Sequence, residues 1–254
     1  MPLTPALLRR TRATAGCAAA LAMASCSYEA RPAVRIFAAA SLTGPFEVLA
    51  QRFRERHPAL RVELHCAGTP QLVMQLRQGA PADVFAAANE LQMRAVSEAG
   101  LTEEAPRAFA TNSLALVTAA ANPEAITTVD DLGRADVQCL LCAPEVPAGR
   151  YARQMLQRAG LEVRSVSDEP SVRAVVSKVE LGVVDAGVVY RTDAIAAGDR
   201  VCHVPVPPHL NVVATYPIVT TSTGQQVEQG RAFVDFVLSP EGQRILAAHG
   251  FSSP

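Results

Sequence analysis

The sequence predicts an α/β fold of two lobes joined by a two-strand hinge. Three observations lead to this expectation. A strand–turn–helix unit occurs four times, two units in each half of the chain; two apolar segments between these halves can cross from one lobe to the other; and a last helical stretch follows the second crossing. Ligands of open α/β sheets bind beyond the carboxyl ends of the strands, so we expect a site where the four turns meet, in a cleft that hinge motion can close.

The composition fits one large or two medium α/β domains. The 254 residues are 49% hydrophobic, with no tryptophan and 5% aromatic residues, and the formal charge is −1. Without the three arginines of the predicted leader, 20 basic and 24 acidic residues remain, a charge of −4. Nucleic acid binding needs clustered basic residues, and Lys178 is the single lysine, so we expect no nucleic acid partner. An anion would have to be held by local dipoles.

Residues 1–26 have the pattern of an export signal. Three arginines precede an apolar run at residues 15–24, which is too short to span a bilayer. Small residues before Cys26 resemble a lipoprotein cleavage box, with Met23 where leucine is usual, and residues 22–24 would serve ordinary signal peptidase equally. We expect an exported protein, either periplasmic or membrane-anchored through lipid at Cys26. A disordered terminus is the alternative.

The first strand–turn–helix unit, residues 34–57, supplies a candidate hydrogen-bond donor. Its apolar strand runs into three alanines, and Ser41 then stands before a helical pattern that stops at Pro58. Free amides and the positive dipole end of a helix start bind an anion without charged side chains, and the serine hydroxyl adds a donor. An ordinary N-cap serine is the structural alternative.

The second unit, residues 61–79, repeats this pattern. Thr69 is expected to cap its helix, and Pro70 suits the first helical position. Residues 80–87 follow as a turn into a buried strand. Asp83 in that turn could be a catalytic carboxylate, but an aspartate in such a place more often braces the turn.

The two crossings follow from the segments beyond a helix at residues 89–99. A strand at residues 109–117 has a different character from those before it, and we place the first crossing near residue 112. Residues 211–219 form the return, and a C-terminal helix at residues 228–249 is expected to pack on the first lobe. The predicted division is lobe I, residues 33–111 plus 217–254, and lobe II, residues 112–216.

The second lobe contains the other two units. A strand at residues 137–142 leads to a turn at 147–150, and a strand at residues 163–166 leads to a turn at 170–173. A further apolar strand ends at Tyr190. A tyrosine hydroxyl at a strand end can donate to an anion, whereas the structural alternative is a core tyrosine bonded to backbone.

The cysteines, the histidines and the short motifs of the sequence do not indicate an enzyme or a metal site. Cys139 and Cys142 lie three residues apart on a predicted strand and therefore face opposite sides, so we expect buried thiols rather than a redox or zinc pair. Whether these two, or Cys66 and Cys202, form a disulfide is left open. The five histidines lack metal-ligand spacing, and no hydrolase, Walker or zinc-protease motif occurs. We expect no cofactor.

With these turns placed, the chain resembles the periplasmic molybdate-binding proteins of ABC transporters. The matching motifs are AAASLT at residues 38–43, GAPADVF at 79–85, PEVPAGRYA at 144–152, DAGVVYRTDA at 185–194, YPI at 216–218 and GF at 250–251. The resemblance implies a type 2 periplasmic binding protein fold with molybdate or tungstate held between the lobes by neutral donors. It also implies a transporter permease, with its ATPase, as partner. We expect a monomer.

Transferred motif by motif, the resemblance implies five binding residues. Ser41 would give its hydroxyl and amide, and Thr69 stands where the family has a serine in the same role. Ala148 and Val172 would give backbone amides, and Tyr190 its phenolic hydroxyl. These positions are the helix starts and the strand-end tyrosine that the residues themselves indicate.

The chain departs from the family at two positions. Pro70 follows Thr69 where a second serine is usual and has no N–H to donate, and Ala143 stands where aspartate is common. Both changes bear on affinity and on the preference between molybdate and tungstate.

Three other functions are weighed against this one. The first is a receptor for sulfate or another oxyanion. The second is a dehydratase or transferase on the same fold, which would need Asp83 or Asp185 as acid or base with a perturbed pKa in the cleft. The third is the sensing domain of a regulator, for which the chain shows no DNA-binding helix pair.

Overall fold

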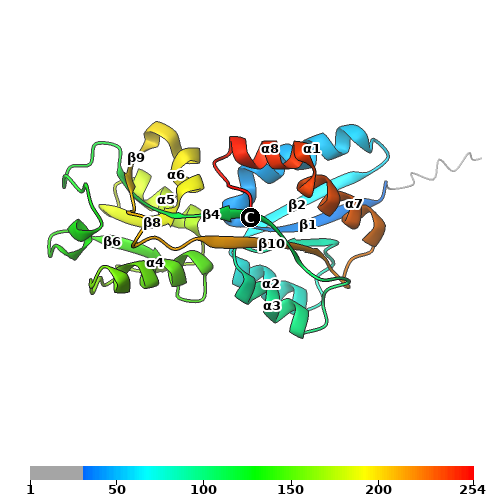
Figure 1. The fold of residues 1–254 in the computed structure, drawn as a ribbon, viewed down its shortest axis with the longest axis horizontal. Helices are drawn as coiled ribbons and strands as arrows, with labels where there is room; N and C mark the ends of the chain where they lie inside the picture. Colours follow the sequence, from blue (N-terminus) through cyan, green and yellow to red (C-terminus); the bar gives the residue numbers. More distant parts are fainter. Residues whose placement is uncertain (1–30) are drawn as a thin grey trace, which may run out of the picture. The chain divides into compact units, whose positions relative to one another are not determined.

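The computed structural model describes residues 31–254, and the predicted leader with Cys26 lies outside the described residues. Residues 31–254 form two five-stranded sheets, ordered β2-β1-β3-β10-β4 and β7-β6-β8-β5-β9 (Figure 1). The strands of the first sheet are β1 Ala33–Ala39, β2 Arg61–Ala67, β3 Val84–Ala86, β4 Arg107–Asn112 and β10 Ala214–Thr220. Those of the second are β5 Leu114–Ala119, β6 Cys139–Cys142, β7 Asp168–Glu169, β8 Ala186–Tyr190 and β9 Val201–Pro205.

Helices cover both faces of each sheet. Around the first sheet these are α1 Thr43–Arg56, α2 Thr69–Arg77, α3 Glu90–Glu98, α7 Val227–Leu238 and α8 Pro240–Ala248. Around the second they are α4 Pro147–Arg158, α5 Val172–Glu180 and α6 Arg191–Ala197. In Figure 1, α1, α7 and α8 lie on one side of the first sheet and α2 and α3 on the other, while α4 lies opposite α5 and α6. The predicted α/β class is confirmed.

In each sheet the strands that lead into helices are parallel neighbours. β1 pairs in parallel with β2 and β3, and β6 pairs in parallel with β7 and β8. The carboxyl ends of these strands therefore meet at one edge of each sheet, and the helix starts that follow them meet there too.

The chain crosses between the sheets at two places. β4 ends at Asn112 and β5 begins at Leu114, so Ser113 alone separates the two strands, where the sequence suggested one continuous strand. The return runs between β9 and β10. Asn211 ties the crossings together, because its side chain accepts from Leu114 N–H at 2.8 Å and donates to Leu114 C=O at 3.0 Å. The predicted lobe boundary at 111/112 lies within β4, and the boundary at 216/217 lies within β10.

The predicted strand at residues 163–166 is wrong. This segment has no regular secondary structure, and only Asp168–Glu169 pair with β6. The Ser165 hydroxyl accepts the N–H of Leu141 at 2.8 Å and donates to Ser167 C=O at 2.6 Å. A side chain thus takes a hydrogen bond that a neighbouring strand would otherwise supply.

The single C-terminal helix predicted over residues 228–249 is also wrong. It is two helices, α7 and α8, divided at Ser239 and Pro240. Proline cannot continue a helix, because it lacks an N–H and its ring clashes with the preceding turn. Ser239 then caps α8 by accepting from Gly242 N–H at 3.2 Å. Both helices pack on the first lobe, as expected.

Asp83 has the structural role that the sequence favoured. Its carboxylate accepts the N–H of Arg35 at 2.7 Å and that of Gln226 at 2.6 Å. It therefore joins the start of β1 to the segment before α7. This engagement leaves no role for Asp83 as a catalytic base.

The four cysteines of the described segment are free. Cys139 and Cys142 are buried in β6, as predicted, and burial raises the pKa of the Cys139 thiol to about 12. Cys66 and Cys202 are half-buried and unpaired. Among residues 31–254, none of the helices has the length and apolar character needed to cross a membrane.

Candidate functional site

Ser41 lies where β1 ends. A short 3₁₀ turn, Ala40–Leu42, separates β1 from α1, and the residue that caps α1 is Leu42. The alternative of an ordinary N-cap serine is therefore wrong. Ser41 is buried, and its hydroxyl lies 3.0 Å from the hydroxyl of Tyr216.

Thr69 is the first residue of α2 rather than its cap. Gly68 precedes it as the cap, and Pro70 follows as the second helical residue. Thr69 is buried at the end of β2, beside the turn that holds Ser41, because β1 and β2 are parallel neighbours.

The second lobe contributes two more helix starts. Ala148 is the second residue of α4, after Pro147, and Val172 is the first residue of α5. Both are buried. Backbone N–H groups in the first turn have no acceptor within their own helix and carry the positive end of its dipole, so both amides are available to a ligand.

Tyr190 ends β8 with its side chain enclosed. The residue is 1% exposed, and its hydroxyl has no hydrogen-bond partner among the described residues. Burial raises the pKa of Tyr190 well above its ordinary value, so the phenol keeps its proton. A buried, unpartnered O–H group costs free energy unless a ligand accepts from it.

The structure brings all five predicted site residues to one small cavity. Ser41 and Thr69 come from the first lobe, and Ala148, Val172 and Tyr190 from the second. The remaining lining residues are Ala39, Ala40, Gly68, Ala88, Val146, Pro147 and Ser171. The lining contains no charged side chain. In this structure the cavity has a volume of about 10 Å³, room for about one water molecule.

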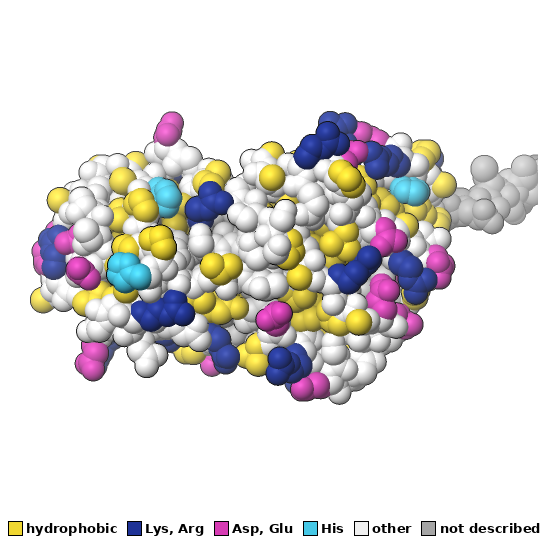
Figure 2. Space-filling model, viewed as in Figure 1, with side chains coloured by type: hydrophobic (Ala, Val, Ile, Leu, Met, Phe, Trp, Pro, Cys, Tyr) yellow, Lys and Arg dark blue, Asp and Glu magenta, His cyan; other side chains and the backbone are white. Residues whose placement is uncertain are grey.

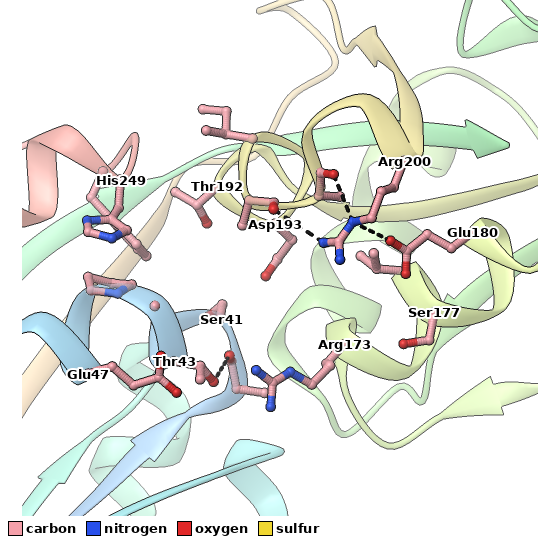
Figure 3. Close-up of a pocket in the computed structure, with 18 of the residues that line it drawn as sticks. Ser41, Thr43, Glu47, Arg173, Ser177, Glu180, Thr192, Asp193, Arg200 and His249 are labelled. Carbon is pink, nitrogen blue, oxygen red and sulfur yellow. Dashed lines mark hydrogen bonds and ion pairs between the residues drawn. The ribbon is translucent and has the colours of Figure 1, made fainter. Parts of the chain in front are cut away.

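A larger cavity of about 580 Å³ adjoins the small one and also has Ser41 in its wall. Figure 3 shows it between the two lobes, with Arg173 and Asp193 near Ser41 and with Arg200 paired to Glu180. Sequence reasoning missed this cavity, because its walls come from three separate segments, residues 40–47, 173–200 and 248–251, whose juxtaposition no local pattern reveals.

Asp193 is the most perturbed carboxyl group beside the site. It accepts the N–H of Tyr190 at 3.1 Å, and its burial raises its pKa to about 7. The Tyr190 N–H bond and the charge of Arg173 lower this pKa, but burial outweighs both. Near neutral pH this carboxyl therefore holds a proton for much of the time.

Several contacts join the lobes in this structure. The side chain of Gln92 donates to Glu145 C=O at 3.3 Å across the cleft. Gly68 stands so close to Pro170 that a Cβ atom would overlap the Pro170 carbonyl oxygen. The guanidinium of Arg191 also donates to Gly250 C=O. These contacts hold the two lobes together around the small cavity.

Charged side chains of both signs are interspersed over the face shown in Figure 2, and neither sign forms a continuous patch on it. On this face a negative ligand would not be attracted by a basic surface. The uncharged lining of the small cavity agrees with this distribution.

Two α/β lobes, two crossing strands and helix starts that converge on one cavity between the lobes define the class of two-lobed solute-binding proteins. Residues 34–252 match the family model described as bacterial extracellular solute-binding protein. The molybdate-binding protein ModA of Mycobacterium tuberculosis is 39% identical over 219 residues, which cover 86% of this chain and 84% of that protein. The chain belongs to this family of extracellular solute-binding proteins, and within it to the molybdate-binding protein family.

Solved structures agree on the fold. The periplasmic molybdate-binding protein of Azotobacter vinelandii superposes with a TM-score of 0.77 at 20% identity, covering 87% of this chain and 99% of that one. The sulfate-binding protein SubI of Mycobacterium tuberculosis gives a TM-score of 0.78 at 18% identity, covering 87% of each chain. At these identities the likeness establishes the fold and not the ligand. The proteins of this family are binding proteins, and this chain is not an enzyme.

Proposed function

We propose that this protein captures molybdate, and tungstate as its close analogue, in the small cavity between lobe I, residues 33–111 plus 217–254, and lobe II, residues 112–216. The proposal includes delivery of the oxyanion to the permease and ATPase of an ABC importer. One observation supports it above the others: hydrogen-bond donors of both lobes line a single cavity with no charged side chain.

The chemistry of the lining favours a fully ionised oxyanion. The amides of the helix starts and the hydroxyls of Ser41, Thr69 and Tyr190 can all donate. Each hydrogen bond to a charged group contributes roughly 1.5–3 kcal/mol, so about six of them support sub-micromolar binding after the cost of closure. A low local dielectric strengthens such hydrogen bonds, so burial of the ligand between the lobes would add to them.

The same lining disfavours a ligand that carries a proton. Phosphate near neutral pH brings an O–H group, and the small cavity offers no carboxylate to accept from it. Molybdate, tungstate and sulfate are ionised and differ in size. We propose that the site prefers the oxometallates over sulfate, because the relative that is 39% identical is a molybdate-binding protein.

Calorimetric titration of the protein with molybdate, tungstate, sulfate and phosphate tests this function. We expect sub-micromolar binding of molybdate and tungstate, and sulfate binding weaker by at least about tenfold, a difference of 1.4 kcal/mol. Sulfate binding as tight as molybdate would replace the proposal with a sulfate receptor, and no binding of any of these anions would reject an oxyanion receptor altogether.

A variant pair assigns the binding to the cavity. Ser41→Ala should weaken molybdate binding roughly 10-fold or more, because a charge-assisted hydrogen bond is lost. The matched control is Ser97→Ala, which removes a buried serine hydroxyl without a partner from α3, away from the cavity. Equal affinity losses in both variants would contradict the assignment.

We further propose export by the leader at residues 1–26, lipid attachment at Cys26, and a monomeric receptor. The leader pattern supports export and the small residues before Cys26 support lipid attachment, while the extracellular family supports export alone. Metabolic labelling with a radioactive fatty acid should mark the wild type and not Cys26→Ser. A labelled Cys26→Ser protein, or an unlabelled wild type recovered in the soluble fraction, would exclude the anchor.

A further inference from the structure

A chain of four buried polar side chains links the small cavity to both crossing strands. Ser41 of the first lobe contacts Tyr216 of β10, Tyr216 contacts Asn112 of β4, and Asn112 contacts Thr192 of α6 in the second lobe. All four residues are at most 8% exposed. Burying polar groups costs free energy unless they form hydrogen bonds with one another. Each contact in this chain should therefore have a defined donor and acceptor.

The orientation of the Asn112 amide sets that direction. Its oxygen accepts the N–H of Ser113 at 3.0 Å, so its NH₂ group faces the interior. From there it donates to the Thr192 hydroxyl at 2.8 Å and, over a longer 3.4 Å, to the Tyr216 hydroxyl. The Tyr216 oxygen therefore already accepts a hydrogen bond, and its own proton is free to be donated elsewhere.

The Ser41 oxygen lies 3.0 Å from the Tyr216 oxygen, within reach of the Tyr216 proton, and either hydroxyl could be the donor of this hydrogen bond. Burial raises the pKa of Tyr216 above its ordinary value, so this proton stays on the phenol. When Tyr216 donates to Ser41, the serine keeps its own O–H for another partner. If Ser41 instead donated its proton to Tyr216, only the lone pairs of its oxygen would face an anion.

We propose that Tyr216 is the positioning residue of the oxyanion site: its phenol donates to the Ser41 oxygen and thereby directs the Ser41 hydroxyl proton to the ligand. This inference rests on the proposed function of Ser41. Ser41 and Tyr216 are 175 positions apart in the sequence. The chain of donors runs from Asn112 through Tyr216 and Ser41 to the anion, and each bond polarises the next.

The surroundings of Tyr216 suit this task. Its ring meets those of Phe109, Tyr190 and Phe251 edge to face, with centroids 6.3, 5.7 and 5.3 Å away. This packing fixes the ring and therefore keeps the phenolic oxygen next to Ser41. The same ring lies against that of Tyr190, which also lines the cavity, so one aromatic cluster holds two hydroxyl groups in place.

A double-mutant cycle with Ser41→Ala and Tyr216→Phe tests the inference, using the oxyanion that the wild type binds most tightly. Tyr216→Phe keeps the ring and removes only the hydroxyl. We expect it to weaken binding about 5- to 20-fold in the wild-type background, the loss of one oriented hydrogen bond. In the Ser41→Ala background it should change the affinity less than about twofold, because no serine proton remains to be directed.

A buried hydroxyl on the same strand provides the control. Thr220 of β10 is buried and donates to Glu104 at 3.0 Å, far along the strand from the cavity. Thr220→Val should lower the melting temperature of the ligand-free protein and leave the affinity unchanged. A melting-temperature loss in Tyr216→Phe with unchanged affinity would make Tyr216 purely structural and overturn the inference.

The remaining outcomes separate the two proposals. Equal affinity losses from Tyr216→Phe in both backgrounds would show that Tyr216 acts independently of Ser41, which also overturns the inference. Binding that Ser41→Ala weakens and Tyr216→Phe leaves intact would retain the oxyanion site and reject the positioning role. A wild type that binds no oxyanion would reject both.

Discussion

The Tyr190 hydroxyl shows how a binding residue differs from a packing residue. The side chain is enclosed, yet its O–H group has no partner among the described residues. Such a group costs about 1–3 kcal/mol when left unsatisfied. This free-energy cost is removed only when a ligand accepts the hydrogen bond from the Tyr190 hydroxyl.

Tyr190→Phe should therefore separate stability from binding. We expect the ligand-free variant to be as stable as the wild type or more stable, since a buried unsatisfied hydroxyl is removed. Its molybdate affinity should fall roughly 10- to 100-fold. Chemical denaturation without ligand and calorimetry with ligand measure the two effects. A large loss of stability in the absence of ligand would contradict this account.

Asp193 should give the protein a pH-dependent stability. Its folded pKa is raised to about 7 from an ordinary value of 3.8, so between these values the folded state binds more protons than the unfolded chain. The free energy of unfolding contributed by this group therefore falls as pH rises from about 4 to 7 and stays low above 7. Between pH 5 and 8 the melting temperature should fall further in the wild type than in Asp193→Asn.

The same carboxyl should affect binding. A dianion next to Asp193 disfavours its ionised form, so molybdate affinity should decrease as pH rises through 7. Because Glu47, Glu180 and His249 also line the adjoining cavity, the comparison with Asp193→Asn isolates its share. Parallel affinity curves for the two proteins between pH 6 and 8 would assign the pH dependence to another group.

At the residue scale, the sequence predicted the positions that lie at recognisable local signals. Ser41, Thr69, Ala148 and Val172 follow strand-to-helix turns, and Tyr190 ends an apolar strand. Tyr216 and Asn112, which link the site to the crossing strands, were not identified as functional residues. Tyr216 and Asn112 sit in strands where an aromatic or polar residue has no local signature, and only tertiary contacts bring them to Ser41.

At the element scale, the errors of the sequence reading have specific physical causes. The periodic pattern over residues 228–249 continues through Pro240, but proline kinks or breaks a helix interior, and here two helices form. The place of residues 163–166 before a turn and a helix predicts a strand, yet Ser165 satisfies a β6 amide with its side chain. Hydrophobic patterns report which residues are buried, while backbone hydrogen bonds depend on partners elsewhere in the chain.

Substitution of Gly68 tests whether the helix starts of the two lobes must approach one another for binding. Its backbone angles are open to alanine, with φ −56° and ψ 133°, but an added Cβ would overlap the Pro170 carbonyl oxygen in the other lobe. Gly68→Ala should leave each lobe folded and hinder closure. Overpacking costs typically 1–3 kcal/mol, so we expect a loss in molybdate affinity of roughly 5- to 150-fold by calorimetry.

Gly44 provides the matched control for this glycine. It lies in the first turn of α1, and a Cβ there would meet only the His249 ring at 3.5 Å, an ordinary contact. Gly44→Ala should bind molybdate like the wild type. Unchanged binding by Gly68→Ala as well would mean that the lobes need not approach as closely as this structure shows.

At the scale of the whole described segment, residues 31–254, the contacts between the lobes correspond to a closed receptor. The helix starts of both sheets face one cavity, and the outer contacts Gln92–Glu145 and Arg191–Gly250 hold the lobes together beyond it. The two-lobe α/β plan follows from the sequence, because repeated strand–helix units and two crossings leave few other topologies. The closed state itself depends on contacts between distant residues, which a single sequence does not specify.

Closure should be linked to the ligand. An anion that contacts donors of both lobes binds the closed state better than the open state and shifts the population toward it. Small-angle X-ray scattering should then give a smaller radius of gyration for the wild type with saturating molybdate than without it. Gly68→Ala should show a smaller decrease at the same fractional occupancy, since its added methyl group stands between the lobes. An identical radius of gyration with and without ligand would mean that the free protein is already closed, and affinity would then depend on ligand access to a preformed cavity.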